Sequence, residues 1–173
     1  MTIWRCRLTT GIASTSTARF TRATSVSGTI ARSRALSLHF STRVARASDF
    51  TRAPDARRKS LGLHTGTGCR TRVSPTRFRL PDVAVILGER PRSGILDRPP
   101  FLVIEVLSPE DRANRVEERI DDYLRFGIPW IWVLDPLTGR GHVYHEGNRT
   151  PVTDGMYRTE NPLIEMNFFE LLD

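Results

Sequence analysis

The stretch FLVIEVL, residues 101–107, constrains the fold of this chain more than any other stretch. Six of its seven residues are strongly apolar, which is typical of a strand buried on both faces of a sheet. Such a strand requires a packed layer on each side. The seventh residue is Glu105, and carboxylates are almost never fully buried unless a partner compensates their charge. The stretch therefore predicts a central strand that contains a carboxylate with a specific partner.

Four other segments have strand character. The first two of the ranges below are short apolar runs closed by turn residues. The third is expected to pair with the second as a hairpin across the turn DPLTG, and the fourth alternates weakly. They are residues 81–87 (PDVAVIL), 130–136 (WIWVLDP), 139–147 (GRGHVYHEG) and 69–74 (CRTRVS). The Gly- and Pro-rich stretch 88–100 is expected to be a loop, and FFELL near the C-terminus is expected to be a closing helical turn.

One helix is predicted between the two most apolar strands. Asn114, with Glu117 three residues later, is a start that resembles a capping box, and Gly127 supplies a stop. Between these limits, apolar residues recur at the spacing of one helical face; they are Val116, Ile120, Tyr123 and Leu124. The order of the elements predicts a mixed β-sheet core with a packed amphipathic helix, in an α/β or α+β arrangement.

The positive charge of the chain is confined to its first third. The 173 residues carry a formal net charge of +7, which alone would suggest a polyanionic partner. Residues 1–58 hold 11 Arg against two acidic residues, or +9, whereas residues 59–173 hold 15 basic and 17 acidic residues, or −2. The part that has folded character is therefore slightly acidic, and the net charge does not identify a partner.

The first 58 residues are rich in Arg, Ser, Thr and Ala and show neither strand nor helix periodicity. Such a segment cannot bury enough apolar surface to offset the entropy of ordering. Three interpretations stay open: a disordered basic tail, an organellar transit peptide, or an aberrant start translated in a wrong frame. Disorder or an aberrant start is favoured, and residues 59–173 are expected to form the folded domain.

The cysteine content and the lack of long apolar runs predict a cytoplasmic protein. Cys6 and Cys69 make neither a disulfide framework nor a zinc motif, which favours a reducing compartment. No apolar run is long enough for a transmembrane helix, and the start lacks the apolar core of a secretory signal. No membrane partner is therefore expected.

Asp82 and Glu105 are the candidate metal ligands. Asp82 opens one apolar strand and Glu105 interrupts the next, and the connection is short enough for the two strands to be sheet neighbours. Two carboxylates held together repel, and a divalent cation removes this conflict; ligation by a few oxygens suits Mg²⁺. The residues alone leave a structural alternative open, in which Asp82 caps a turn and Glu105 pairs with an arginine or reaches solvent.

Three stretches, RLPDVAVIL, PPFLVIEVLSPEDR and RIDDYLRFGIPWIWVLDP, resemble the Uma-two family of restriction-endonuclease-like proteins, within the PD-(D/E)xK nuclease superfamily. The resemblance covers residues 61–173 in order and spacing. It implies a sheet flanked by helices and a metal site made by Asp82 and Glu105. It also implies a catalytic basic residue on the helix, at a position held here by Arg119.

The chain departs from the family pattern in two places. The superfamily lysine two residues after the glutamate is replaced by Leu107, and the helix position, commonly Lys in the family, is Arg119. Arginine can bind a phosphate bidentately but stays protonated, so it cannot act as a base. The alternative for Arg119 is an ordinary ion pair with Glu118 or Asp122. Family members also open with a helix and a small antiparallel sheet that residues 1–58 do not show, so the domain is expected to be incomplete at its N-terminus.

The resemblance implies a Mg²⁺-dependent endonuclease that hydrolyses DNA phosphodiester bonds, with Asp82, Glu105 and Arg119 as catalytic residues. Two alternatives remain: an inactive, truncated or frame-shifted remnant of such a nuclease, and a non-catalytic nucleic-acid-binding module. The oligomeric state stays open, a homodimer included. His142 and His145 are weak metal candidates, because residues i and i+3 of a strand point to opposite faces.

Overall fold

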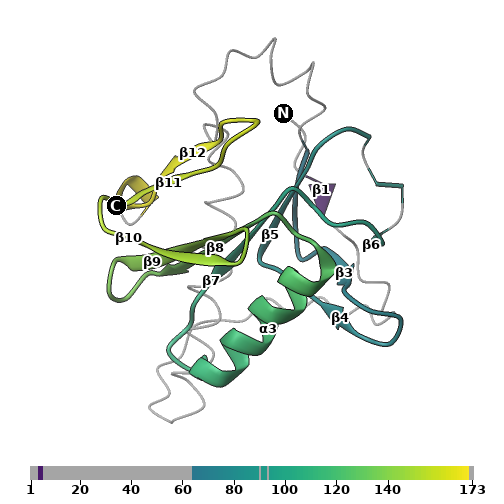
Figure 1. The fold of residues 1–173 in the computed structure, drawn as a ribbon, viewed down its shortest axis with the longest axis horizontal. Coiled ribbons are helices and arrows are strands. Elements are labelled where there is room, and N and C mark those ends of the chain that lie inside the picture. Colours follow the sequence, from purple (N-terminus) through teal and green to yellow (C-terminus); the bar gives the residue numbers. More distant parts are fainter. Residues whose placement is uncertain (1–3, 6–63, 90, 93, 172–173) are drawn as a thin grey trace, which may run out of the picture.

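The computed structural model describes residues 4–5, 64–89, 91–92 and 94–171. Its largest element is a seven-stranded mixed sheet with the strand order β1-β2-β5-β7-β8-β9-β10 (Figure 1). These strands are β1 (Trp4–Arg5), β2 (His64–Thr67), β5 (Val83–Ile86), β7 (Leu102–Val106), β8 (Trp130–Asp135), β9 (Arg140–His145) and β10 (Asn148–Val152). The stretch 101–107 is confirmed as the central strand, because β7 is fourth of the seven.

The connection between β7 and β8 explains why the sheet is mixed. β7 pairs antiparallel with β5 and parallel with β8, and β9 and β10 then continue antiparallel as hairpins. Parallel neighbours need a crossover segment, and helix α3 (Ala113–Phe126) supplies it. All five residues of β7 are buried, which matches its nearly continuous apolar sequence. The fold is therefore α+β, as the pattern of the sequence predicted.

Helix α3 ends where the sequence predicted but begins differently. Gly127 has a left-handed φ of 88°, and the N–H groups of Gly127 and Ile128 donate to the carbonyls of Leu124 and Tyr123. The predicted capping box at Asn114 is wrong, because the N-cap residue is Arg112 and no side chain caps the first turn. Extended backbone at Arg112, rather than a side-chain hydrogen bond, marks the start of the helix.

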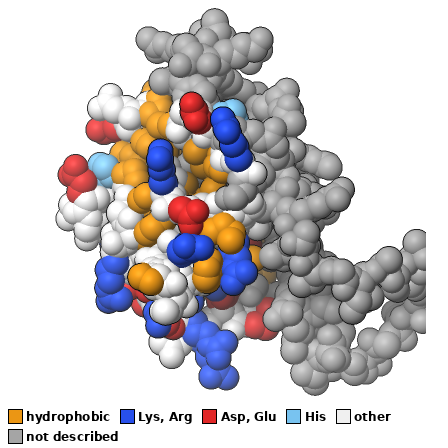
Figure 2. Space-filling model, turned by 90° about the vertical axis from the view of Figure 1, so that its right-hand side faces the viewer, with side chains coloured by type: hydrophobic (Ala, Val, Ile, Leu, Met, Phe, Trp, Pro, Cys, Tyr) orange, Lys and Arg blue, Asp and Glu red, His pale blue; other side chains and the backbone are white. Residues whose placement is uncertain are grey.

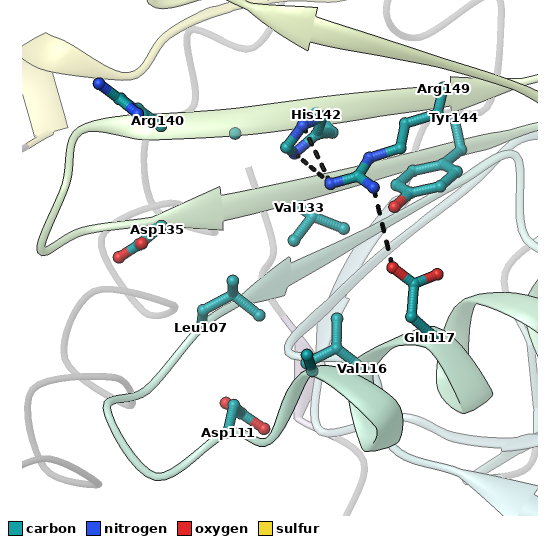
Figure 3. A pocket seen from close by; sticks show the side chains of 12 residues that line it. Leu107, Asp111, Val116, Glu117, Val133, Asp135, Arg140, His142, Tyr144 and Arg149 are labelled. Atoms are coloured by element: carbon teal, nitrogen blue, oxygen red, sulfur yellow. Dashed lines mark hydrogen bonds and ion pairs between the residues drawn. The ribbon is translucent and has the colours of Figure 1, made fainter.

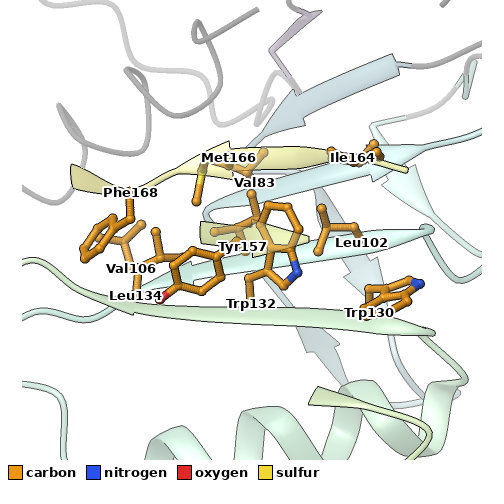
Figure 4. Close-up of a cluster of buried hydrophobic side chains, with 12 residues drawn as sticks. Val83, Leu102, Val106, Trp130, Trp132, Leu134, Tyr157, Ile164, Met166 and Phe168 are labelled. Atoms are coloured by element: carbon orange, nitrogen blue, oxygen red, sulfur yellow. The ribbon is translucent and has the colours of Figure 1, made fainter. Parts of the chain in front are cut away.

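Two layers cover the sheet on opposite faces (Figure 1). One is α3, whose Ile120 and Tyr123 pack against Val103, Ile131 and Val133. The other is the antiparallel pair of β11 (Met156–Arg158) and β12 (Glu165–Asn167), which the sequence did not predict. Figure 4 shows the core on that side, where the apolar residues are Val83, Leu102, Val106, Trp130, Trp132, Leu134, Tyr157, Ile164, Met166 and Phe168.

A small three-stranded sheet lies beside the helix. Its strands, in the order β4-β3-β6, are β4 (Phe78–Arg79), β3 (Arg70–Arg72) and β6 (Ile95–Leu96). β3 confirms the weak strand predicted at 69–74, whereas β6 lies inside the stretch 88–100 that was expected to be only a loop. On the side of the molecule that carries this sheet, arginine, acidic and apolar side chains are interspersed (Figure 2).

The two ends of the chain differ in how much the structure describes. A short 3₁₀ helix, η1 (Phe169–Leu171), confirms the closing helical turn. Within residues 1–58 only β1 is described, and it pairs in parallel with Gly66 and Thr67 of β2. The predicted disorder of that segment otherwise lies outside the described residues, and the domain boundary at residue 59 stays a prediction. Among the described residues, no helix is long and apolar enough to cross a membrane.

Candidate active site

Asp82 and Glu105 are brought together by the pairing of β5 with β7. Val83 lies opposite Ile104 in this antiparallel register, so the preceding Asp82 comes opposite Glu105. Asp82 Oδ2 accepts a hydrogen bond of 2.8 Å from the backbone N–H of Val106, which holds the aspartate against β7. The two strands are sheet neighbours, as the sequence predicted, and they place both carboxylates at the middle of the sheet.

Glu105 is buried beneath helix α3, with only 4% of its surface exposed. The Tyr123 hydroxyl donates a hydrogen bond of 2.5 Å to Glu105 Oε1. Arg119 Nε lies 3.4 Å from Glu105 Oε2 and makes no hydrogen bond, although it is buried. Both partners project from the same face of α3, because positions four apart on a helix are neighbours. Glu105 is therefore tightly held at one oxygen and only loosely paired at the other.

The environment of Glu105 favours its neutral form. Its pKa is raised to about 7, chiefly because burial penalises the charged carboxylate and because the Asp82 carboxylate repels it. Arg119 and the Tyr123 hydrogen bond lower the pKa of Glu105 but do not cancel these two effects. Burial also raises the pKa of Tyr123 well above its ordinary value, so this hydroxyl stays protonated and can donate.

Asp111 anchors Arg119 from the other side. Arg119 Nη2 lies 3.0 Å from Asp111 Oδ1, and Asp111 Oδ2 accepts hydrogen bonds from the backbone N–H and the hydroxyl of Ser108. Burial opposes ionisation of Asp111, but the Ser108 hydrogen bonds and Arg119 lower its pKa below the ordinary value. The result is a continuous chain of contacts from the loop after β7, through Arg119, to Glu105.

The three predicted site residues thus meet in one cluster, but two of their partners were missed. Arg119 pairs with Asp111 and Glu105 and not, among the described contacts, with Glu118 or Asp122 as its alternative assumed. Tyr123 had been assigned only to the apolar stripe, although a tyrosine within such a stripe carries a hydroxyl that needs a partner once buried. Asp111 gave no signal beyond its place in a polar loop.

The donor set suits a hard cation that takes few ligands from the protein. Asp82 and Glu105 supply only carboxylate oxygens, and their mutual repulsion is a conflict that a divalent cation would relieve. No group of three or more His, Cys, Asp or Glu arranged for a metal occurs in the part of the chain that the structure describes. Carboxylate oxygens without a thiolate or an imidazole are ligands that suit Mg²⁺, which keeps several waters and binds phosphate oxygens, better than zinc.

Comparison with solved structures defines the class of fold. The chain is similar to the crystal structure of "a putative nuclease belonging to DUF820" from Anabaena variabilis, with a TM-score of 0.60 and 17% sequence identity. The likeness covers 77% of this chain and 78% of that one. At this identity the likeness shows a shared fold, here a restriction-endonuclease-like α+β sheet. No curated protein matches the chain.

The family is shown by the sequence itself. The model of the Uma2 family, described as "Putative restriction endonuclease", matches residues 20–172, so the chain belongs to this family. The match begins at residue 20, whereas the motifs in the sequence predicted that the resemblance to the family begins at residue 61. Family membership supports a nuclease function for the protein.

Proposed function

We propose that this protein is a Mg²⁺-dependent endonuclease that hydrolyses phosphodiester bonds of DNA. The observation that carries the proposal is the meeting of two carboxylates, Asp82 and Glu105, with the guanidinium of Arg119 beside them. Glu105 is buried and Asp82 is partly buried, so without a cation this pair of like charges is costly for stability, which supports a functional site.

Asp82 and Glu105 would hold the cation. When bound, Mg²⁺ neutralises charge on a phosphodiester and makes water a better nucleophile near neutral pH. The backbone N–H of Val106 and the hydroxyl of Tyr123 keep the two carboxylates in place by hydrogen bonds. These donors also stabilise the ionised forms, which are the forms that bind a metal.

Arg119 would bind the phosphate that is cleaved. Its guanidinium stays charged and suits bidentate contact with phosphate oxygens, and Asp111 fixes its direction through the 3.0 Å contact. Arginine cannot accept a proton, so Arg119 stabilises charge and leaves the removal of a proton from water to other groups. We further propose a cytoplasmic location, because two cysteines in the sequence are too few for a disulfide framework.

The second candidate function is nucleic-acid binding without cleavage, as expected of an inactive copy. Leu107 favours it, because this apolar residue occupies the position of the superfamily lysine. A site without any lysine lacks the group that is most easily tuned to assist proton transfer. Cleavage by the wild-type protein separates the two candidates.

The test is cleavage of supercoiled plasmid DNA by the full-length protein with Mg²⁺, with Mn²⁺ and with EDTA. We expect cleavage with the metals and none with EDTA. Asp82→Asn and Glu105→Gln should each lower the rate by roughly a hundredfold or more, because each removes a charged ligand. Asp121→Asn is the matched control, because Asp121 is exposed on α3 and its ion pair among the described residues is with Arg125.

Two results would refute the proposal. One is cleavage by the purified protein that proceeds in EDTA and is unchanged in Asp82→Asn and Glu105→Gln, because such activity does not depend on this carboxylate site. The other is DNA binding by wild-type protein without cleavage in either metal, which would support the binding module instead.

A further inference from the structure

A hollow of about 270 Å³ lies between the first turn of α3 and strands β8, β9 and β10 (Figure 3). Its apolar lining includes Leu107, Val116 and Val133. In Figure 3, His142 and Arg149 lie on the side of the hollow opposite Leu107 and Val116. The hollow therefore has an apolar side and a planar polar side, and its size suits a group smaller than a whole drug-sized ligand.

The polar side of the hollow is organised around Arg149. The Arg149 guanidinium lies 3.1 Å from His142 Nε2, 3.8 Å from a Glu117 carboxylate oxygen and 5.8 Å from the ring centre of Tyr144. Burial and the Arg149 charge both lower the pKa of His142, so its imidazole is neutral and accepts from Arg149. The guanidinium is thus held over an aromatic ring, with planar groups on the polar side of the hollow.

The charges of the lining argue against a phosphate or a metal as the occupant. Three carboxylates line the hollow, those of Asp111, Glu117 and Asp135, against the two guanidinium groups of Arg140 and Arg149. This small negative excess disfavours a bare phosphate, and guanidinium groups disfavour a metal. A neutral, flat molecule with both hydrogen-bond donors and acceptors on its edges can instead use both kinds of group.

The hollow adjoins the candidate active site. Leu107 lines it and lies two residues after Glu105, which is about 7 Å along an extended chain. Asp111 also lines it while binding Arg119, and Val133 is the register partner of Glu105 on β8. A nucleic-acid strand whose phosphate binds Arg119, as proposed above, would therefore bring its neighbouring nucleotide near the hollow that Asp111 lines.

We propose that this hollow binds one nucleobase of the strand that the active site engages, the flat face of the base packing between the apolar side and the planar side groups of His142 and Arg149. The inference rests on the proposed function for its substrate class. A base that enters such a pocket must first leave its stack, so the pocket favours single-stranded or locally unpaired substrate.

The test uses the neutral nucleoside 2-aminopurine deoxyriboside, whose fluorescence reports stacking, and the full-length protein in EDTA. Ala113→Trp places a large ring at the mouth, because Ala113 is exposed and lines the hollow. Asn114→Trp is the matched control, because Asn114 is the next residue, is equally exposed and is not part of the lining. Circular dichroism of both variants checks that α3 is retained.

We expect saturable quenching with wild type and Asn114→Trp, and a dissociation constant about tenfold higher with Ala113→Trp, within the range that base stacking contributes. Inorganic phosphate should not displace the nucleoside. Equal binding by Ala113→Trp, displacement by phosphate, or no saturable binding to wild type would each overturn the inference. Nucleoside binding needs neither metal nor cleavage, so a protein that binds the nucleoside but does not cut DNA would refute the proposed function alone.

Discussion

Glu105 is a residue on which stability and function make opposite demands. Its burial and the neighbouring Asp82 raise its pKa to about 7, so in the folded protein without a cation this carboxyl loses its proton only as the pH reaches neutrality. The proposed function needs the ionised form. The residue is therefore expected to weaken the metal-free protein and to become favourable only when a cation is bound.

The stability of the metal-free protein should fall between about pH 4.5 and pH 7. In this window the folded state binds a proton that the unfolded state, with the ordinary pKa of 4.5, has already released, so rising pH favours unfolding. Glu105→Gln should remove this slope and at pH 8 should be as stable as wild type or more so, by roughly 1–3 kcal/mol. Urea unfolding of wild type and Glu105→Gln in EDTA at several pH values measures the two free energies of unfolding.

The same substitution should abolish stabilisation by Mg²⁺ or Mn²⁺. Arg119 keeps its contact with Asp111 in Glu105→Gln, so it is not left as an unpaired buried charge. Thermal unfolding with and without each cation gives the comparison. Two observations together would mean that Glu105 serves as a structural ion-pair partner: the mutant is much less stable than wild type in EDTA, and neither cation stabilises the wild type.

Helix α3 serves two sites with two parts of its surface. Arg119 and Tyr123 reach Glu105, whereas Asp122 holds the small sheet through Arg79 Nη2 at 2.6 Å and Arg77 Nη1 at 3.2 Å. β4 ends at Arg79, three residues before Asp82. The ion pairs between α3 and the β4 region therefore fix where the chain enters β5, and with it the position of Asp82.

Loss of the Asp122 ion pairs should destabilise the fold. Asp122→Asn removes the closest acidic partner of Arg79, whose side chain is 20% exposed and keeps Glu118 at 3.0 Å, and should cost roughly 1.5–3 kcal/mol. Asp121→Asn, one residue away and exposed, should change the free energy of unfolding by less than about 0.5 kcal/mol. Urea unfolding at pH 7 compares the two, and equal effects would contradict the buried role of Asp122.

The pH dependence of the Asp122 contribution has the opposite sign to that of Glu105. Burial opposes its ionisation, but the hydrogen bonds and charges of Arg79 and Arg77 lower its pKa below the ordinary 3.8. Its stabilising contribution is therefore present above the unfolded pKa and is lost as pH falls through the lower folded value. In Asp122→Asn the acid-induced loss of stability should be smaller than in wild type.

The whole molecule depends on covering both faces of one sheet. Helix α3 covers one face, and β11 with β12 covers the other, where Tyr157 packs against Trp132 and Phe168 packs against Tyr157. A sheet whose central strands are apolar on both faces cannot be stable with one face open to water. The C-terminal segment is thus part of the core that positions the site, although it contributes no site residue.

Phe168→Ala should therefore destabilise the entire fold. Phe168 is 1% exposed, and removal of a buried phenyl ring typically costs about 3–5 kcal/mol. Phe169→Ala is the control at the neighbouring position, because Phe169 is 46% exposed and should lose less than about 1 kcal/mol. Urea unfolding followed by tryptophan fluorescence measures both, and a mild effect of Phe168→Ala would contradict a core role for Phe168.

The sequence by itself determined the elements whose signals are local. Apolar runs marked β5, β7 and β8, a stripe of apolar residues marked α3, and Gly127 marked its end, because each signal depends on neighbouring residues only. The proximity of Asp82 and Glu105 was also predictable, since a short connection between two strands favours their pairing. The family was recognisable from the same stretches.

Only the tertiary structure decided which side chains meet across elements. The contacts of Arg119 with Asp111 and of Tyr123 with Glu105 join elements whose relative placement no local pattern fixes. The layer of β11 and β12 was missed for the same reason: its short strands have weak propensity of their own and are stabilised by packing on the sheet. The hollow beside Glu105 likewise exists only because β9 and β10 come to lie opposite the first turn of α3, a placement set by the register of the whole sheet.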